Sequence, residues 1–523
     1  MLVLATFFIL CVAYVLLNYY NKLCYWKDKG IRYVTPLPIF GNSLPTLLQS
    51  VTYPEYIIDL YKQFPNERYC GTYQYGQPIL LLRDLNLIKR ILTKEFDTFS
   101  EHPQSSEPNE DTLWGKNLFA AKGETWRQLR KTISPMFTTS NIKSMFELID
   151  KCATQLMKYL SEKNEDVIEI ELMDLFKRYS SDTIASVSFG IECNSFKDRN
   201  NDFIRMGAEL TNFGGLQKLK QLLYTVNPTI AKLLNVKMHP DNVSNFFRNL
   251  VKNSIRNRED KTAVRPDYIQ YLIESRKGAC KERENTQKVT KAEFDATKET
   301  NWDPINKKFA SKLSDDDITA QAIDFFYGGF YSTASLMYFC VYELAINQEI
   351  QEKLRKEVDE ALQDCGKINF DALVRMKYLD MTISETLRKW PTTTWIDRKS
   401  NKSIVIEPED FNMERPLYLE VGTICWIPVF AIQRDPKYWP DPKKFEPERF
   451  SEDNLEKICN SSFLPFSAGP RSCVGSRFAL LEAKLVIFYI ISKFEVIPTE
   501  KSVSNKNPHL TSSSSFWFGF KKR

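Results

Sequence analysis

The chain has 523 residues, and its 71 Lys and Arg against 66 Asp and Glu leave a formal net charge of +5. So small an imbalance argues against a nucleic-acid-binding protein, which concentrates its basic residues in one stripe or patch. Eleven cysteines without a CxxC pair argue against a disulfide framework and suit a reducing compartment.

The N-terminal segment is apolar and uncharged. Residues 1–17 carry a single polar side chain, Thr6, and about 20 apolar residues span the core of a bilayer. We therefore predict a transmembrane anchor at residues 1–20. A cleaved signal peptide is the alternative, but no basic region precedes the apolar stretch and no small-residue cleavage site follows it.

The residues after this segment support the anchor. Aromatic residues suited to a bilayer surface follow it, and so do basic residues: Tyr19, Tyr20, Tyr25 and Trp26, then Lys22, Lys27, Lys29 and Arg32. The positive charge places the rest of the chain on the cytosolic side. We interpret residues 21–41 as a basic and proline-rich hinge, and residues 42–523 as one domain, since no Gly/Ser-rich linker divides them.

Two segments of the early body have recognisable patterns. Apolar and polar residues alternate weakly over residues 69–82, on both sides of Tyr75-Gly-Gln-Pro78. This pattern predicts two strands and a turn. Farther on, Trp126 and Arg130 are four residues apart in a helical pattern, so they share one helix face. An indole N–H and a guanidinium on one face suit a carboxylate, although such a pair also occurs on ordinary surfaces.

Residues 213–236 are mostly apolar with interleaved lysines, which suits either a surface that dips toward a membrane or two core helices. From Ser314 to about Asn347 the pattern predicts a long helix, because Ser314 is a good cap residue and three aspartates fill the first turn. Gly328-Gly329 in its middle costs about 1 kcal/mol per glycine. Such a defect indicates a packing or functional reason.

Glu385 and Arg388 are one turn apart in the next helical segment and can form an ion pair. Nearer the C-terminus, Cys473 lies in the run Phe466-Ser-Ala-Gly-Pro-Arg-Ser-Cys-Val-Gly475. Gly469 and Gly475 permit tight turns that aim amides inward. Beside Arg471 and a following helix start, Cys473 is expected to have a lowered pKa and to bind a soft metal. A buried structural cysteine is the alternative.

This run resembles the haem-thiolate signature of cytochromes P450, Phe-x-x-Gly-x-Arg-x-Cys-x-Gly, without a mismatch. The resemblance covers nearly the whole chain after residue 35 and is greatest to insect microsomal P450s of the detoxifying group. It implies a mostly α fold with small β-sheets, haem b between the long central helix and the cysteine loop, and an N-terminal transmembrane helix. In that fold the central helix is locally opened where oxygen binds.

The resemblance also implies roles for individual residues. Cys473 would ligate the haem iron, and Arg449 would join Glu385 and Arg388 in a structural network. Other residues would surround the cofactor: Trp126, Arg130, Arg398, Arg471 and Phe466. A further set would face the substrate: Thr392, Thr394, Trp395 and Phe330.

One departure from the family pattern concerns oxygen activation. The acid and threonine that usually relay protons fall here on Tyr331 and Ser332. A phenol of pKa about 10 can relay a proton but cannot act as a carboxylate. Thr333 would substitute if an opened helix rotated by one residue. We therefore expect an active oxygenase that loses some reducing equivalents as hydrogen peroxide.

The implied protein is a single-pass monooxygenase of the endoplasmic reticulum membrane with a cytosolic catalytic domain. It would insert one atom of O2 into xenobiotic or endogenous lipophilic molecules with electrons from NADPH. No dinucleotide fingerprint follows a strand, so the implied donor is NADPH–cytochrome P450 reductase with its FAD and FMN, and cytochrome b5 is a second candidate. The alternatives are a haem-thiolate isomerase or dehydratase, which needs no reductase, and a non-catalytic haem carrier or sensor of hydrophobic ligands.

Overall fold

A computed structural model describes residues 20, 22–103, 113–211, 220, 223, 237, 239–259, 265–278, 307–409, 415–459, 461–503 and 516–523. The expected anchor, apart from Tyr20, and almost all of residues 213–236 lie outside this set. Within the set, no helix combines the length and the apolar character that crossing a bilayer requires.

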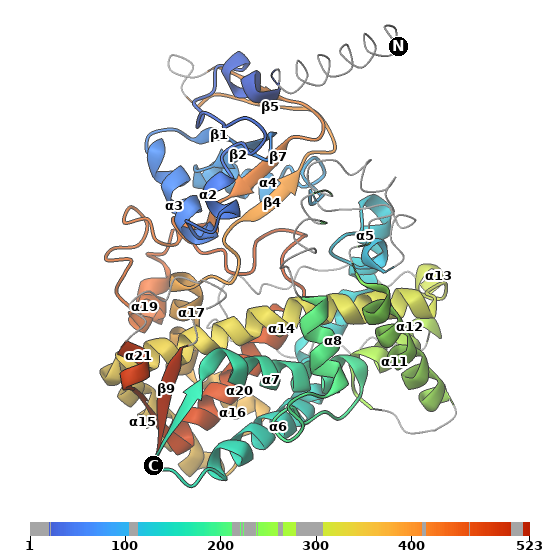
Figure 1. The fold of residues 1–523 in the computed structure, drawn as a ribbon, viewed down its shortest axis with the longest axis vertical. Helices are drawn as coiled ribbons and strands as arrows, with labels where there is room; N and C mark the ends of the chain where they lie inside the picture. The colour runs from blue at the N-terminus through green and yellow to red at the C-terminus, as the bar shows by residue number, and fades with distance from the viewer. Residues whose placement is uncertain are drawn as a thin grey trace, which may run out of the picture.

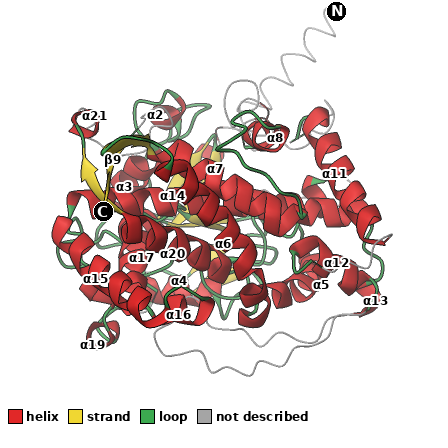
Figure 2. Cartoon of the chain, turned by 90° about the horizontal axis from the view of Figure 1, so that it is seen from below, coloured by secondary structure: helices red, strands yellow, loops and turns green. Residues whose placement is uncertain are grey.

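Helices dominate the described chain and the strands form three small sheets, as the family resemblance implied (Figure 2). The α-helices are α2 (Leu44–Leu47), α3 (Tyr53–Gln63), α4 (Leu85–Leu92), α5 (Gly123–Ile133), α6 (Thr139–Ser161), α7 (Leu172–Ile184), α8 (Asp202–Leu210), α11 (Asp241–Glu259), α12 (Tyr268–Arg276), α13 (Lys307–Ala310), α14 (Asp315–Ile346), α15 (Gln348–Cys365), α16 (Phe370–Arg375), α17 (Lys377–Lys389), α18 (Val429–Ile432), α19 (Glu452–Leu455), α20 (Ser476–Lys493) and α21 (Glu500–Val503). The strands are β1 (Tyr69–Gln74), β2 (Gln77–Leu82), β3 (Val167–Glu171), β4 (Ile396–Lys399), β5 (Ile404–Ile406), β6 (Leu417–Leu419), β7 (Ile424–Ile427), β8 (Phe494–Pro498) and β9 (Trp517–Lys522).

Helix α14 crosses the molecule and other helices pack along it (Figure 1). Its 32 residues make it about 48 Å long. Ser314 caps it in a reciprocal capping box with Asp317, so the predicted start and extent are confirmed. The expected local opening is absent, because the helix continues without interruption through Gly328 and Gly329.

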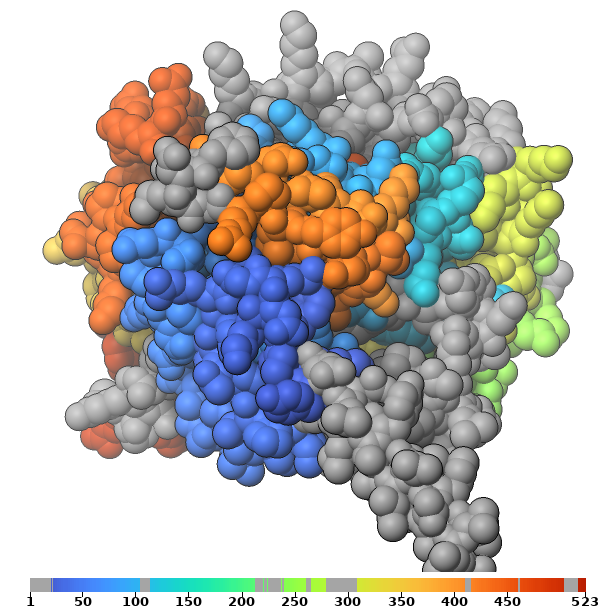
Figure 3. Space-filling model, turned by 90° about the horizontal axis from the view of Figure 1, so that it is seen from above, coloured from blue at the N-terminus to red at the C-terminus, as the bar shows by residue number. Residues whose placement is uncertain are grey.

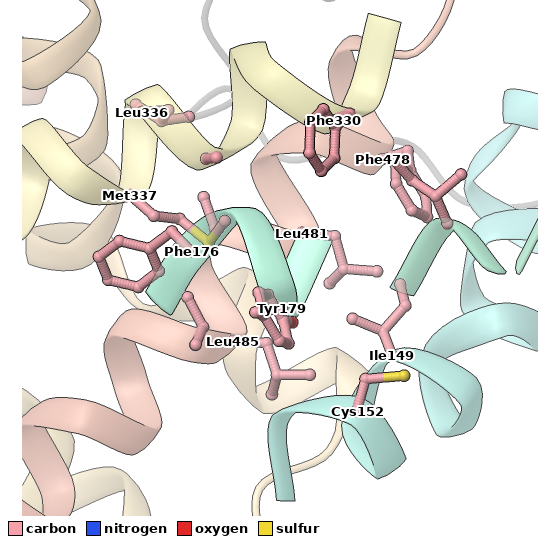
Figure 4. Packing of buried hydrophobic residues seen from close by; sticks show 14 of the residues in the cluster. Ile149, Cys152, Phe176, Tyr179, Phe330, Leu336, Met337, Phe478, Leu481 and Leu485 are labelled. Atoms are coloured by element: carbon pink, nitrogen blue, oxygen red, sulfur yellow. The ribbon is translucent and has the colours of Figure 1, made fainter. Parts of the chain in front are cut away.

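The core lies where α14 meets α6, α7 and α20. Figure 4 shows Cys152 from α6, Tyr179 from α7, Leu481 from α20 and Leu336 from α14 converging in one apolar cluster. Phe330 belongs to this cluster and stacks on another α14 ring, that of Phe326, with centroids 4.9 Å apart. Burying a side chain of this kind contributes about 1.5–3 kcal/mol. Phe330 therefore packs in the core, whereas the resemblance placed it against substrate.

The first sheet has the order β1-β2-β7-β4 and lies beside the N-terminal elements (Figure 1). Strands β1 and β2 form the predicted hairpin, in which Tyr75 and Gly76 have φ angles of +49° and +77°. Two consecutive positive φ angles are typical of a type I′ turn. Strand β4 pairs antiparallel with β7, which sets Arg398 opposite Cys425. This register brings Arg398 to the functional site.

One of the two other sheets joins distant parts of the chain. The order β3-β9-β8 places β9 in the middle, pairing residues 167–171 with residues 517–521. Strands β5 and β6 form a separate antiparallel pair. The pairing of β3 with β9 spans a long sequence distance and therefore costs loop-closure entropy, which the β5–β6 pair largely avoids.

The start of the described chain packs onto the first sheet. Trp26 is fully buried, and its indole N–H donates to the Thr72 carbonyl at 3.1 Å. A Cβ at Gly71 would overlap the Trp26 ring. Trp26 was expected in an aromatic belt at a bilayer surface, and that expectation is wrong because Gly71 leaves a pocket for the ring.

A second set of contacts ties the same N-terminal residues to the loop before β7. Lys29 Nζ lies 2.7 Å from a carboxylate oxygen of Glu420, and the Tyr25 hydroxyl donates to the other oxygen of that carboxylate. Figure 3 shows this surface, where the dark blue N-terminal residues adjoin the orange segment. Residues 22–34 are therefore held to the domain by both packing and polar contacts.

Candidate functional site

The loop that carries Cys473 is shaped by tight backbone contacts before α20 begins. Gly469 has φ +74°, and a Cβ at that position would overlap the carbonyl oxygen of Leu92, so only glycine fits. The amide of Cys473 donates to the carbonyl of Phe466 at 2.9 Å. Gly475 differs from the expectation, since its φ of −92° suits any residue. Its contribution is an amide hydrogen-bonded to the Cys473 sulfur.

Electrostatics at Cys473 also differ from the expectation. Burial raises the pKa of the thiol, while the Gly475 amide and the Arg130 guanidinium only partly oppose this rise. The predicted lowering of the pKa is therefore wrong for the protein without a metal, because desolvation outweighs the local donors. A coordinated metal ion would reverse the balance, since a ligating thiol is deprotonated.

Arg471 was expected to supply positive charge beside the sulfur, and instead its guanidinium turns to the main chain. It donates to the carbonyls of Ser100 at 2.9 Å and Ala121 at 2.7 Å. The same group lies over the Trp126 ring, 4.4 Å from the centroid. Arg471 thus fixes the loop against the segment before α5.

Cys473 lines a cavity of about 780 Å³ between α14 and its own loop. The wall is mainly apolar and aromatic. The cavity brings together most of the residues singled out from the sequence: Cys473, Trp126, Arg130, Arg398, Arg471, Phe466, Ser332, Thr333, Thr392, Thr394 and Trp395. Two others, Phe330 and Tyr331, are not part of its wall.

Three guanidinium groups converge on this cavity, those of Arg130, Arg398 and Arg471. Burial lowers their pKa values to about 10, about 10 and about 9, so all three remain cationic at neutral pH. Arg398 donates to Ser467 Oγ at 3.1 Å, and its buried Nε has no hydrogen-bond partner among the described residues. Buried cations of this kind need anionic partners.

These residues fit a haem group. A porphyrin presents an apolar ring to an apolar wall, and its two propionates would offset two of the three cations. Cys473 is the one thiol among the described residues that line the cavity, and thiolate is an established axial ligand of haem iron.

One face of α14 carries a polar stripe along the cavity. Its polar side chains are those of Gln321, Asp324 and Ser332, and together with Gly328 these positions recur every three or four residues, the spacing of a single helix face. The amide oxygen of Gln321 accepts the Leu118 amide at 3.0 Å. The sequence interpretation singled out only Ser332 as a site residue, although polar residues at helical spacing in an apolar helix were a signal for the others.

The residues expected to handle protons lie in different environments. The hydroxyls of Ser332 and Thr333 donate to the carbonyls four residues earlier, which is compatible with the unopened helix. Tyr331 is 44% exposed, and Lys177 Nζ lies 5.4 Å from its ring centroid. Tyr331 therefore faces α7 and does not take the place of an acid at the cavity.

A carboxyl group that the sequence interpretation missed lies behind Thr333. Glu482 of α20 is fully buried beside the hydroxyls of Ser180, Thr183 and Thr333. Burial raises its pKa to about 8, so this carboxyl holds a proton through most of the physiological range. A glutamate inside the apolar run 478–491 was the available signal.

The predicted ion pair forms deep in the fold and supports the cysteine loop. Arg388 donates to both oxygens of Glu385 at 2.7 and 2.8 Å, and Arg449 Nε lies 3.5 Å from the same carboxylate. Gln433 connects this group to the loop, because it donates to the Arg388 carbonyl at 3.0 Å and accepts the Leu464 amide at 2.8 Å. Sequence reasoning missed Gln433, since nothing in its neighbourhood marks so distant a contact.

Comparison with known proteins agrees with this geometry. A family model described as Cytochrome P450 matches residues 32–516. Cytochrome P450 9e2 of Blattella germanica is 35% identical over 539 residues, which cover 99% of this chain and 97% of that protein. Probable cytochrome P450 9f2 of Drosophila melanogaster is 36% identical over 489 residues, with 91% and 90% covered. Cytochrome P450 6j1 of Blattella germanica is 32% identical, with 94% and 91% covered.

Proposed function

Since the chain belongs to the cytochrome P450 family and is a monooxygenase of that family, we propose that it inserts one atom of O2 into lipophilic small molecules, xenobiotic or endogenous. The observation that carries the proposal is an apolar cavity of about 780 Å³ with the Cys473 thiol in its wall. Bound haem supplies the iron that activates O2 when a thiolate ligates it.

Individual residues of the cavity wall would serve this chemistry. Cys473 would hold the iron, and Arg130, Arg398 and Trp126 would hold the propionates. Arg471 keeps the loop in place through main-chain carbonyls. Thr392, Thr394 and Trp395 line the same cavity and are available to contact substrate.

The electron donor and the membrane anchor belong to the same proposal. We propose NADPH–cytochrome P450 reductase, which carries FAD and FMN, as the donor, and cytochrome b5 as a second one. The absence of a dinucleotide fingerprint in the sequence supports a separate donor. The apolar residues 1–17 and the basic residues after them support a single span in the endoplasmic reticulum membrane, with the domain in the cytosol.

The test uses the full-length protein in membranes with reductase, NADPH and a lipophilic extract under ¹⁸O2. We expect products that carry one ¹⁸O atom and form only when NADPH and reductase are present. An isomerase or dehydratase would convert its substrate without NADPH. A carrier would bind ligand and convert nothing. Either of these results would contradict the proposal.

Ser332→Ala tests proton handling at α14. A positioned proton donor contributes about 10²–10⁴-fold to a rate, and cavity water would replace part of that contribution. We therefore expect the ratio of product formed to NADPH consumed to fall several-fold and hydrogen peroxide to rise. Tyr331→Phe is the matched control, since Tyr331 lies outside the cavity wall. If Tyr331→Phe uncouples the enzyme and Ser332→Ala does not, the assignment of the two residues is reversed.

A further inference from the structure

Asp324 brings a carboxylate to the cavity wall eight residues before Ser332, about 12 Å along α14. One of its oxygens accepts the Phe119 amide across 3.3 Å, a long hydrogen bond. Burial raises the pKa of this carboxyl to about 7, and the Phe119 amide and Arg471 oppose the rise. The carboxylate form is thus poorly solvated where it stands and would gain from a cationic partner.

Among the described residues, the charge of Arg471 acts on Asp324 from a distance, but no basic side chain pairs with this carboxylate directly. Asp397, the other carboxylate in the wall, lies 2.7 Å from His102 and is hydrogen-bonded in that way, whereas no side chain of the described residues forms an ion pair with Asp324. Arg471 is engaged with main-chain carbonyls and the Trp126 ring. A cationic ligand would therefore supply the direct ion-pair partner that Asp324 lacks among the described residues.

Space for such a ligand lies one turn farther along the helix. Gly328 follows Asp324 by four residues and shares its face. A Cβ added at Gly328 would meet no atom within 4 Å. The surface beside the carboxylate is consequently open cavity.

Aromatic rings surround the same place. The ring of Trp114 lies 6.1 Å from that of Phe119 and 6.0 Å from that of Tyr327, and all three line the cavity. The Tyr327 hydroxyl donates to the Leu210 carbonyl at 2.8 Å, so this residue offers its ring and not its hydroxyl. Aromatic faces attract cations, most strongly where water is excluded.

We propose that the cavity selects lipophilic cations, molecules in which an ammonium group is attached to an apolar body. Asp324 and the rings of Trp114, Phe119 and Tyr327 receive the ammonium group, and the apolar body extends along α14 toward Ser332. This inference rests on the proposed function, because it names a substrate class for the same cavity. The haem propionates would offset two of the three arginines, and the third, Arg471, offsets Asp324 only in part, because burial still raises the pKa of that carboxyl to about 7.

The test compares two ligands of one shape. 4-Phenylbutyltrimethylammonium keeps its charge at every pH and cannot ligate iron, and (5,5-dimethylhexyl)benzene is its neutral carbon isostere. Equilibrium dialysis with the haem-loaded full-length protein gives both affinities. We expect Asp324→Asn to lower the affinity for the ammonium ligand about tenfold and to leave the affinity for the isostere unchanged. Asparagine still accepts the Phe119 amide.

Two further variants complete the test. Trp114→Leu keeps an apolar wall but removes a ring, and we expect it to weaken ammonium binding several-fold relative to the isostere. Asp316→Asn removes a carboxylate from the first turn of α14, where Asp316 pairs with Arg248, and should match the parent. The quantity compared is the affinity for the ammonium ligand divided by the affinity for the isostere. If Asp324→Asn and Trp114→Leu both keep the parent's value, or if Asp316→Asn lowers it as much as Asp324→Asn does, the inference is overturned.

Failure of the proposed function would look different. The absorption spectrum of the reduced carbonyl complex reports thiolate-bound haem before any ligand is added. A protein without that spectrum contradicts the proposed function. A protein with that spectrum, normal binding of the isostere and no response to Asp324→Asn contradicts only the assignment of lipophilic cations.

Discussion

Cys473→Ala protein is expected to lose the red-shifted absorption band of the reduced carbonyl complex that thiolate-bound haem produces. Cys473 is the one thiol among the described residues of the cavity wall, so no other sulfur can replace it there. Because even residues behind a metal ligand change metal affinity by about 10- to 100-fold, loss of the ligand itself should weaken haem binding at least that much. Difference spectroscopy and haem titration measure both effects.

The matched control for this variant is Cys365→Ala, which removes a partly buried thiol outside the cavity. It should keep the band and the haem content of the parent protein. A folded, haem-loaded Cys473→Ala protein that retains the band would show that another group ligates the iron.

Glu385→Gln is expected to cost about 3–5 kcal/mol of stability, because it leaves the fully buried Arg388 without its carboxylate. Burial raises the pKa of Glu385 in spite of two neighbouring arginines, which shows that desolvation dominates at this position. The pair is therefore costly to break rather than strongly stabilising as a whole. Urea unfolding followed by loss of the carbonyl band measures the change.

Glu452→Gln is the control, since Glu452 pairs with Lys377 on the surface at 2.9 Å. A fully exposed pair contributes little to stability, because water and salt screen it. The double variant Glu385→Gln/Arg388→Met should recover part of the stability, because it removes the stranded charge. Equal losses from Glu385→Gln and Glu452→Gln would contradict the assigned role of the buried network.

Local patterns predicted the parts of the molecule that local forces determine. The cap at Ser314, the hairpin around Tyr75 and the Glu385–Arg388 pair each depend on residues within a few positions of one another, and all three are present. The amide contact from Cys473 to Phe466 in the cysteine loop is local in the same way, whereas the contact that requires glycine at position 469 is with the distant Leu92 carbonyl.

Positions set by packing between distant segments could not be predicted in this way. Helix α14 is buried on almost every side, so its apolar pattern could not show that Phe330 faces the core and Ser332 the cavity. Arg471 donates to carbonyls more than 300 residues away in the sequence. Gln433 and Trp26 likewise depend on partners that only the folded chain brings near.

If the proposed N-terminal anchor spans a membrane, the burial of Trp26 has a mechanical consequence. A flexible linker would let the domain rotate relative to the membrane. The Trp26 indole packed on Gly71 instead holds the N-terminal residues in one orientation on the domain. With residues 1–20 across a bilayer, this contact would fix the orientation of the domain relative to the membrane. It would thereby also fix the direction from which molecules dissolved in lipid approach the cavity. A bulky side chain at position 71 would displace the Trp26 ring and change the orientation of the domain relative to the membrane, while every residue of the cavity wall stayed the same.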